Sequence, residues 1–433
     1  MPGDYLPKID FSDERLDNGL RLIMSEDHLA PVVAVNLWYD VGSKHEKPGL
    51  TGLAHLFEHM MFQGSTNVAK SEHFKYIESA GGSLNASTWL QRTNYYESGP
   101  SNQLELFLWL EADRMGGLLD ALGQETLDNQ RDVVKNEKRQ RYDNAPYGTW
   151  WIELIEKLFP EGHPYHHPTI GSMEDLSRVT VDDCREFFST YYAPNNAVLS
   201  IVGDFEPEGA RAMVQRYFGG IPAHPAIPAP PPVAIGLDVG GEVRKVIEDK
   251  VPLPRIFVGY RAPEAGTREM DALTMAAACL FLGDAGAPNK GARLYRHLVR
   301  EQIAQDADFW TQDFIGCSVA GGQVTARPDV DLEKLERAFF DVIASLATDP
   351  PGDEELARAR AGVERQAIQG NFIRAAARAD LLSKYATVFG DPDRANDALP
   401  RLLSVTSEEI ANVARDVFRE DSRVVLTYIP ERA

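Results

Sequence analysis

The stretch Ile221-Pro222-Ala223-His224-Pro225-Ala226-Ile227-Pro228-Ala229-Pro230-Pro231-Pro232-Val233 decides how this chain of 433 residues is organised. Its prolines, spaced by small apolar residues, favour an extended polyproline backbone that acts as a semi-rigid spacer. The stretch falls near the middle of a chain that is too long for one ordinary domain. We therefore predict a domain at residues 1–221, a linker at 222–235 and a second domain at 236–433.

The two halves share one order of elements, which is strands, then helices, then a closing strand. The first half predicts strands at 20–24, 32–39 and 197–202, and helices at 52–62, 71–80, 104–119, 126–142 and 181–191. The second half predicts strands at 243–247, 255–260 and 423–428, and helices at 269–282, 292–300, 332–347 and 353–369. This order predicts an α+β fold of two homologous domains, each a mainly antiparallel sheet packed with helices.

Composition narrows the class of protein. The chain is 43% hydrophobic and carries a formal net charge of −21, so it lacks the basic footprint of a nucleic-acid binder. We find neither a window apolar enough to span a membrane nor a visible targeting segment, and we expect a soluble protein of the cytoplasm or periplasm. Cys184, Cys279 and Cys317 are too few and too scattered for a disulfide framework, so we expect them to be buried and apolar in role.

The most informative motif is His55-Leu56-Phe57-Glu58-His59. On a helix, residues four apart lie on one face, so both imidazoles can reach one metal ion. Neutral imidazoles suit Zn²⁺, and a carboxylate beside the metal can take a proton from water. The order is the inverse of the commoner His-Glu-x-x-His pattern. Gly52 and Gly64 are plausible boundaries of this helix.

A catalytic zinc usually has three protein ligands and one open position. The helix predicted at 126–142 offers four carboxylates near or within it, and the residues alone do not decide among them. These candidates are Glu125, Asp128, Asp132 and Glu137. We favour Glu137 because it shares a helix face with Val133 and Val134 that could pack inward.

Two alternatives apply to the histidines. The motif could be a solvated helix face, but its flanks are apolar, and two histidines and a glutamate there would be costly to bury without a metal or partners. A second cluster, His163, His166 and His167, lies among prolines, where a loop role is more typical than a metal site.

The chain resembles the inverted-zincin family that includes pitrilysin, insulin-degrading enzyme and the mitochondrial processing peptidase. The resemblance spans essentially the whole chain. Beyond His55 to His59 it covers Gly49 to Ala54, Gly64 to Thr66, Gly81-Gly82, Asn85-Ala86, Thr88, Glu111 to Met115, Arg131 to Glu137, Gly162 to Tyr165, Gly171, Tyr192 to Asn196 and Val202 to Asp204.

This resemblance implies specific roles. His55, His59 and Glu137 would hold one Zn²⁺ per chain, and Glu58 would be the general base. Residues 83–88 would form an edge strand that pairs with the substrate backbone, with Asn85 and Ala86 facing the scissile bond. His163 would belong to a structural loop.

The chain departs from the family pattern at two places. Gln130 stands where the family often has a second glutamate that supports the metal site. A neutral glutamine should influence the zinc site less than a glutamate would. Self-sufficient members also carry an Arg and a Tyr, seven residues apart, that bind the substrate and stabilise the oxyanion. Here those positions hold Val299 and Asp306, or Leu298 and Gln305 in the neighbouring register.

The sequence therefore predicts a zinc endopeptidase subunit that hydrolyses peptides or small unfolded polypeptides. We expect two chains to close like a clamshell around a chamber. The second chain would be a related subunit that lacks the zinc motif and supplies the Arg and the Tyr, although a homodimer stays possible. We expect neither nucleic acid nor membrane as a partner. The alternatives are a non-catalytic core subunit and a dedicated presequence-processing peptidase.

Overall fold

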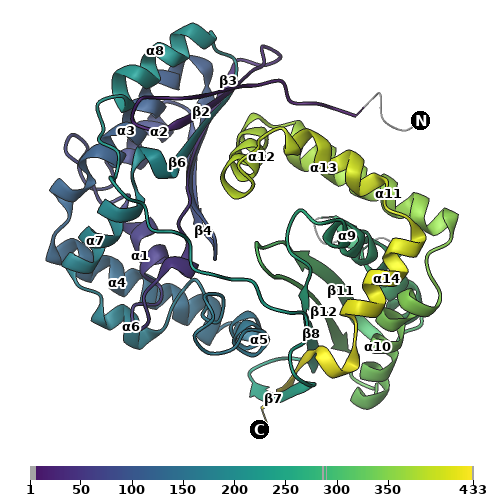
Figure 1. The fold of residues 1–433 in the computed structure, drawn as a ribbon. Helices are drawn as coiled ribbons and strands as arrows, with labels where there is room; N and C mark the ends of the chain where they lie inside the picture. The colour runs from purple at the N-terminus through teal and green to yellow at the C-terminus, as the bar shows by residue number, and fades with distance from the viewer. Residues whose placement is uncertain (1–5, 285–286, 289, 432–433) are drawn as a thin grey trace. The chain divides into compact units, whose positions relative to one another are not determined.

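The computed structural model describes residues 6–284, 287–288 and 290–431, which form two compact units (Figure 1). The first unit draws on Met1–Lys138, His167–Pro231 and Ile368–Asp397, and the second on Arg139–His166, Pro232–Ala367 and Ala398–Ala433. One boundary between the units lies within the proline-rich stretch, between Pro231 and Pro232. The first unit also contains Ile368–Asp397 from the second half of the chain, and the second unit also contains Arg139–His166 from the first half. The simple division at 1–221 and 236–433 stays a prediction about the domains.

The sheet of the first unit has six strands in the order β1-β2-β6-β3-β5-β4. Their bounds are β1 Ser12–Arg15, β2 Arg21–Glu26, β3 Val32–Tyr39, β4 Ser83–Thr88, β5 Thr93–Pro100 and β6 Ala197–Gly203. Strands β2 and β6 run parallel and the other neighbours run antiparallel. Strand β4 lies at the edge and pairs with β5.

The sheet of the second unit repeats this pattern without a counterpart of β1. Its order is β11-β12-β8-β13-β7. Its one parallel pair is β7 with the closing strand β13, which corresponds to β2 with the closing strand β6 in the first unit. The bounds are β7 Val243–Asp249, β8 Arg255–Ala262, β11 Ala304–Gln312, β12 Ser318–Ala326 and β13 Val424–Pro430. A short pair, β9 Gly283–Asp284 and β10 Ala287–Pro288, stands apart. The α+β fold of two homologous domains is therefore confirmed.

Helices accompany both sheets. In the first unit they are α1 Leu53–Met60, α2 Glu72–Ser79, α3 Leu104–Ala121, α4 Gln124–Lys138, α6 Met173–Arg178, α7 Val181–Tyr191, α8 Pro207–Phe218 and α12 Ala375–Val388. In the second they are α5 Trp150–Leu158, α9 Arg268–Leu280, α10 Leu332–Thr348, α11 Asp353–Ala367 and α14 Ser407–Val417, while α13 Arg394–Leu403 crosses the boundary. Short 3-10 turns lie at Ser43–His45, Ser101–Gln103, Pro194–Asn196 and Glu420–Ser422, and π-helical turns at Arg139–Asp143, Tyr295–Val299 and Ile368–Phe372.

Two helices are exchanged between the halves of the chain. Helix α12, from the second half, packs on β3 and β6 of the first unit (Figure 1), where Ser383 Oγ donates to Ser200 Oγ at 2.7 Å. Helix α5, from the first half, packs on β8 and β13 of the second unit, where Trp150 stacks on Phe257. Each exchanged helix follows a π-helical turn, so the exchange obeys the same repeat as the sheets.

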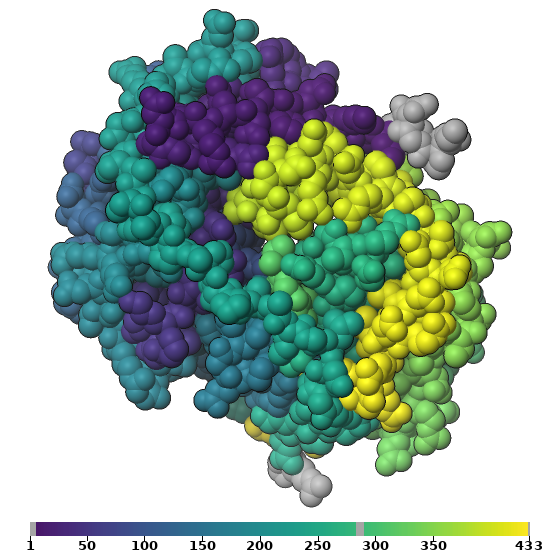
Figure 2. All heavy atoms as spheres, in the orientation of Figure 1, coloured from purple at the N-terminus to yellow at the C-terminus, as the bar shows by residue number. Residues whose placement is uncertain are grey.

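The segment before β1 lies against the residues that follow α12. Ile9 N–H donates to Asn396 Oδ1 at 2.8 Å, and Asn396 Nδ2 donates to the carbonyl of Ile9 at 3.0 Å. Figure 2 shows purple N-terminal residues beside yellow-green residues of the second half of the chain. The two ends of the first unit are thus joined by a pair of hydrogen bonds.

Most predicted elements agree with the structure, and the segment predicted as a helix at 292–300 is helical over residues 293–299, with π rather than α geometry in most of it. The described backbone there is the π-helical turn Tyr295–Val299, in which Arg300 N–H bonds the carbonyl of Tyr295. The apolar spacing that suggested a helix still buries Leu294 and Leu298. Cys184, Cys279 and Cys317 are free and buried, as predicted. Over the described residues, the helices are too short or too polar to cross a membrane.

A cluster of four ionisable side chains is buried beneath the first sheet. His73, Glu97 and Glu111 place possible ligand atoms within 4.8 Å of one another, yet Arg114 lies among them. Its guanidinium pairs with Glu111 and lies 4.2 Å from the ring centre of Tyr95. Burial raises the pKa of Glu97 well above its usual range, aided by the charge of Glu111. Arg114 thus supplies the cation that this cluster needs.

Replacement of Arg114 by methionine should leave Glu111 buried without its cation. We expect a loss of about 3–5 kcal/mol in the free energy of unfolding, measured by urea denaturation. Arg185 is the control, because it is exposed and pairs with Asp182 at 3.3 Å, so Arg185→Met should change stability by about 0.5 kcal/mol or less. Equal losses in the two variants would contradict this account of the cluster.

Candidate metal centre

Helix α1 has one apolar face and one polar face. Its buried residues are Leu53, Ala54, Leu56, Phe57 and Met60. His55, Glu58 and His59 lie between them on the partly exposed side. The helix is preceded by its N-cap residue Gly52, whose φ of 90° is a left-handed conformation that glycine adopts without strain. The prediction that Gly52 marks the boundary is confirmed.

Helix α4 brings Glu137 to this face of α1. Leu127, Gln130 and Val134 form its buried stripe, and Glu137 continues the same spacing by one step. Val133, which we expected to pack inward with Val134, is instead 41% exposed. Of the two valines that we expected to pack inward, Val134 does so and Val133 does not.

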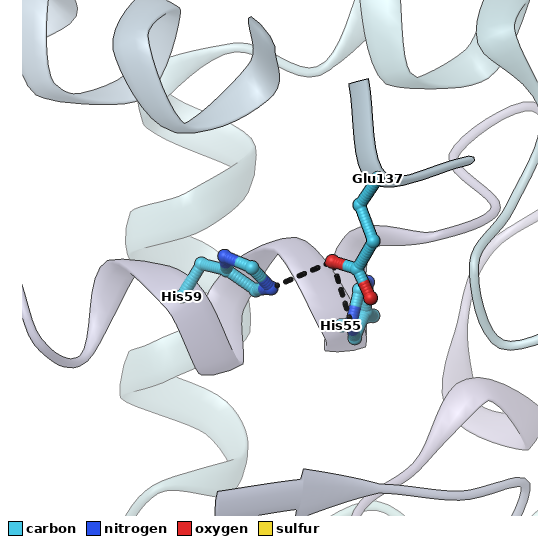
Figure 3. Close-up of side chains that lie close together, drawn as sticks. All are labelled: His55, His59 and Glu137. Atoms are coloured by element: carbon cyan, nitrogen blue, oxygen red, sulfur yellow. Dashed lines mark ion pairs between the residues drawn. The ribbon is translucent and has the colours of Figure 1, made fainter. Parts of the chain in front are cut away.

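Three ligand atoms converge between the two helices (Figure 3). Glu137 Oε2 lies 3.8 Å from His55 Nε2 and 3.3 Å from His59 Nε2, and the three donor atoms lie within 4.8 Å of one another. Zinc bonds of about 2.0–2.1 Å at tetrahedral angles separate the ligand atoms by about 3.3 Å. The donor types and spacings therefore fit one zinc ion.

The other carboxylates that the sequence offered as ligands lie elsewhere. Glu125, Asp128 and Asp132 are exposed on α4. Asp128 accepts hydrogen bonds from Gln124 and Arg131. Among the described residues, Glu137 is the one of the four candidates that groups with the two histidines.

Glu58 lies beside this centre and points to the end of β4. Thr88 Oγ1 donates to Glu58 Oε2 at 2.5 Å, which fixes the orientation of the carboxylate. Burial raises the pKa of Glu58, while the bond from Thr88 and the positive charges of His59 and Arg92 act against this rise. The carboxylate of Glu58 is thus oriented by Thr88 and binds a proton more readily than an exposed glutamate does.

Strand β4 matches the bounds predicted for the edge strand, 83–88. Asn85 is exposed and Ala86 is half-buried. The side-chain oxygen of Asn85 accepts from the N–H of Ala86 at 2.8 Å. An edge strand of this kind offers backbone groups to an added strand.

The residues at which the sequence departs from its family pattern are buried, or make hydrogen bonds to neighbouring residues, or are exposed. Gln130 is buried and donates to Asn129 Oδ1 at 2.9 Å. Leu298 is buried, and Val299 ends the π-helical turn. Asp306 lies on β11 and accepts from Thr325 Oγ1 at 2.8 Å, next to the exposed Gln305.

The second histidine cluster uses its ring nitrogens for structural bonds. His163 Nε2 bonds the carbonyl of Val233 at 3.1 Å, and His166 Nδ1 bonds that of Phe159 at 2.8 Å. His167 Nε2 lies 2.9 Å from Glu46 Oε2. This favours the loop role over a second metal site.

Sequence reasoning missed two side chains that support the centre. Thr88 appeared as part of the resemblance without a role, although its place at the end of an edge strand was a usable signal. Glu46, whose carboxylate accepts from the N–H groups of Gly52 and Ala54, gave no signal, because a cap outside the helix has no fixed spacing.

Comparison with protein families gives two matches. A family described as "Insulinase (Peptidase family M16)" matches residues 21–160. A family described as "Peptidase M16 inactive domain" matches residues 178–363. The first match contains α1 and α4, and the second contains most of the strands of the second unit.

Individual relatives cover most of the chain. It is 28% identical over 424 residues to the "Zinc protease PqqE" of Helicobacter pylori, covering 96% of this chain and 91% of that protein. It is also 28% identical over 328 residues to human "Cytochrome b-c1 complex subunit 1, mitochondrial", covering 75% of this chain and 66% of that protein. The crystal structure of a protease from Helicobacter pylori matches with a TM-score of 0.89 and 27% identity, covering 98% of this chain and all (100%) of that one.

Gly52 provides a test of how tightly the start of α1 is held. A Cβ there would lie 2.8 Å from the carbonyl oxygen of Ile170, on a backbone of positive φ. We expect Gly52→Ala to lower the free energy of unfolding by about 1–3 kcal/mol. Gly220 has open space around a Cβ, so Gly220→Ala should be nearly neutral. Thermal unfolding of both variants measures this, and a neutral Gly52→Ala would contradict the geometry.

Proposed function

The chain belongs to the M16 family of peptidases, and on that premise we propose that it is a zinc-dependent endopeptidase subunit acting on peptides and small unfolded polypeptides. The observation that carries the proposal is the convergence of His55 Nε2, His59 Nε2 and Glu137 Oε2 at the spacings of a zinc coordination shell. Zinc when bound would supply a Lewis acid for the peptide carbonyl.

The residues of the chain would then divide the work. His55, His59 and Glu137 hold the metal, and Glu58 takes a proton from the attacking water and returns it to the leaving amine. The bond from Thr88 keeps the carboxylate of Glu58 in one orientation while the proton moves. The raised pKa of Glu58, caused by burial, makes it a stronger base than an exposed glutamate.

The free edge of β4 is the proposed place for the substrate backbone. A peptide laid along it as an extra strand would run from Ser83 towards Thr88, whose hydroxyl touches Glu58. At Ala86 the backbone N–H already has the side chain of Asn85 as its acceptor, so a peptide carbonyl would replace that bond. We therefore propose Asn85 and Ala86 as substrate contacts.

A partner chain is the second part of the proposal. The side chains of Val299, Leu298 and ionised Asp306 have no hydrogen-bond donor. Gln305 offers one neutral amide, so neither register supplies the pair of donors that an Arg and a Tyr would give to an oxyanion. We propose that a related subunit without the zinc motif supplies them, in a heterodimer that encloses the substrate. Gln130 would then be a neutral neighbour of the metal site that tunes it weakly.

Two other functions remain as candidates. The likeness to a human cytochrome b-c1 subunit supports a non-catalytic core role. Against it stands the complete set of His55, Glu58 and His59, which a scaffold has no need to keep. A peptidase dedicated to presequences is the other candidate, and digestion of an intact presequence protein beside a panel of short peptides separates it from a general peptidase.

Glu58→Gln tests the chemistry. It keeps the shape of the side chain but removes the base, so we expect peptide cleavage to fall about 10²–10⁴-fold while zinc content stays unchanged. Glu78→Gln, on the exposed part of α2, is the control and should cleave normally. A zinc-bound Glu58→Gln protein that cleaves at the wild-type rate would sink the proposal.

The need for a partner is tested by assay of this chain alone, of a related subunit without the motif, and of their mixture. Loss of preorganised oxyanion donors lowers turnover by about 10²–10³-fold, so we expect the mixture to exceed this chain by that factor. Full activity from this chain alone would show that the missing Arg and Tyr are not required.

A further inference from the structure

The start of α1 is closed by a carboxylate from outside the helix. Gly52 has no side chain to act as a cap, and Glu46 takes its place: Oε2 accepts from Gly52 N–H at 2.9 Å and Oε1 from Ala54 N–H at 2.8 Å. The side chain of Glu46 is 0% exposed. A carboxylate at this end both satisfies free N–H groups and complements the helix dipole.

His167 holds Glu46 from the opposite side. Its Nε2 lies 2.9 Å from Glu46 Oε2 and 3.0 Å from the carbonyl oxygen of Ser43. Burial raises the pKa of Glu46, and the bonds from His167, Ala54 and Gly52 oppose that rise. Both oxygens of the Glu46 carboxylate therefore have partners, which hold the side chain in one position.

The loop that follows His167 presses against the same turn. Gly171 has a φ of +71°, and a Cβ on it would lie 2.3 Å from the carbonyl oxygen of Thr51. Asp175 Oδ2 accepts from both the N–H and the hydroxyl of Thr51, at 3.1 and 2.6 Å. The residues just before α1 are thus clamped between Glu46 and this loop.

His55 is the third residue of α1, directly after the Ala54 N–H that Glu46 accepts. Fraying or rotation of this first turn would move the imidazole of His55, while His59 lies one turn further along. We propose that Glu46 and His167 are positioning residues that hold His55 in its zinc-binding orientation. The inference rests on the proposed function, because it assigns their effect to the affinity of that same zinc site.

Residues that orient metal ligands typically change metal affinity by about 10–100-fold when they are removed. Glu46→Gln places an amide N–H against a helix N–H, and His167→Ala leaves Glu46 buried with one partner fewer. Both should lower zinc affinity by about 10–100-fold. His167→Gln keeps an N–H donor in that place and should restore affinity close to the wild-type value.

The experiment is competition for zinc between the full chain and a chromophoric chelator, with thermal unfolding of the zinc-free proteins measured in parallel. Ser383→Ala is the matched control. It removes the buried hydrogen bond from Ser383 Oγ to Ser200 Oγ at 2.7 Å, between α12 and β6 of the same unit, so it destabilises the protein at a bond that does not involve α1. Its zinc affinity should equal that of the wild type.

The outcomes separate the inference from the proposed function. Unchanged zinc affinity in Glu46→Gln and His167→Ala, with zinc-binding wild type, overturns the inference alone. An equal loss in Ser383→Ala also overturns it, because general destabilisation would then explain the effect. A wild-type chain that binds no zinc overturns the proposed function, and the inference with it.

Discussion

The approach of Glu137 Oε2 to the Nε2 atoms of His55 and His59 is the interaction on which the site depends. His55 and His59 lie on the flank of α1, whose other side is buried, and Glu137 lies near the end of α4; polar groups in such a partly buried place need partners. The proposed zinc ion would meet that need, because it would bind all three groups at once. It would also explain why α4 carries Glu137 at the end of a stripe that packs against the core.

The part of this arrangement that could be predicted is the part governed by local spacing. The four-residue interval of His55 and His59 placed both rings on one face, and the alternation at 32–39 gave β3 with its observed bounds. Glu137 could be favoured but not chosen from the residues, because ligands from two helices depend on packing. The helix predicted at 292–300 was located correctly, but its π geometry could not be predicted, because apolar spacing does not distinguish an α-helix from a π-helical turn.

Long-range exchange was beyond the reach of sequence patterns. Asp380 on α12 accepts hydrogen bonds from Asn36, Trp38 and Asn94 in the first sheet, although it comes from the second half of the chain. Nothing near Asp380 in the sequence indicates these partners. The same holds for Glu46 and His167, which are brought together over 121 residues of chain. Such contacts are set by the topology of the chain, and the strand order of the first sheet recurs in the second.

Zinc content after dialysis is the most direct measure of the central claim that His55, His59 and Glu137 form one metal site. The account predicts one zinc per chain in the wild type and none retained by Glu137→Ala, with both proteins folded by circular dichroism. A folded wild type without zinc, or a Glu137→Ala protein that retains its zinc, would contradict it.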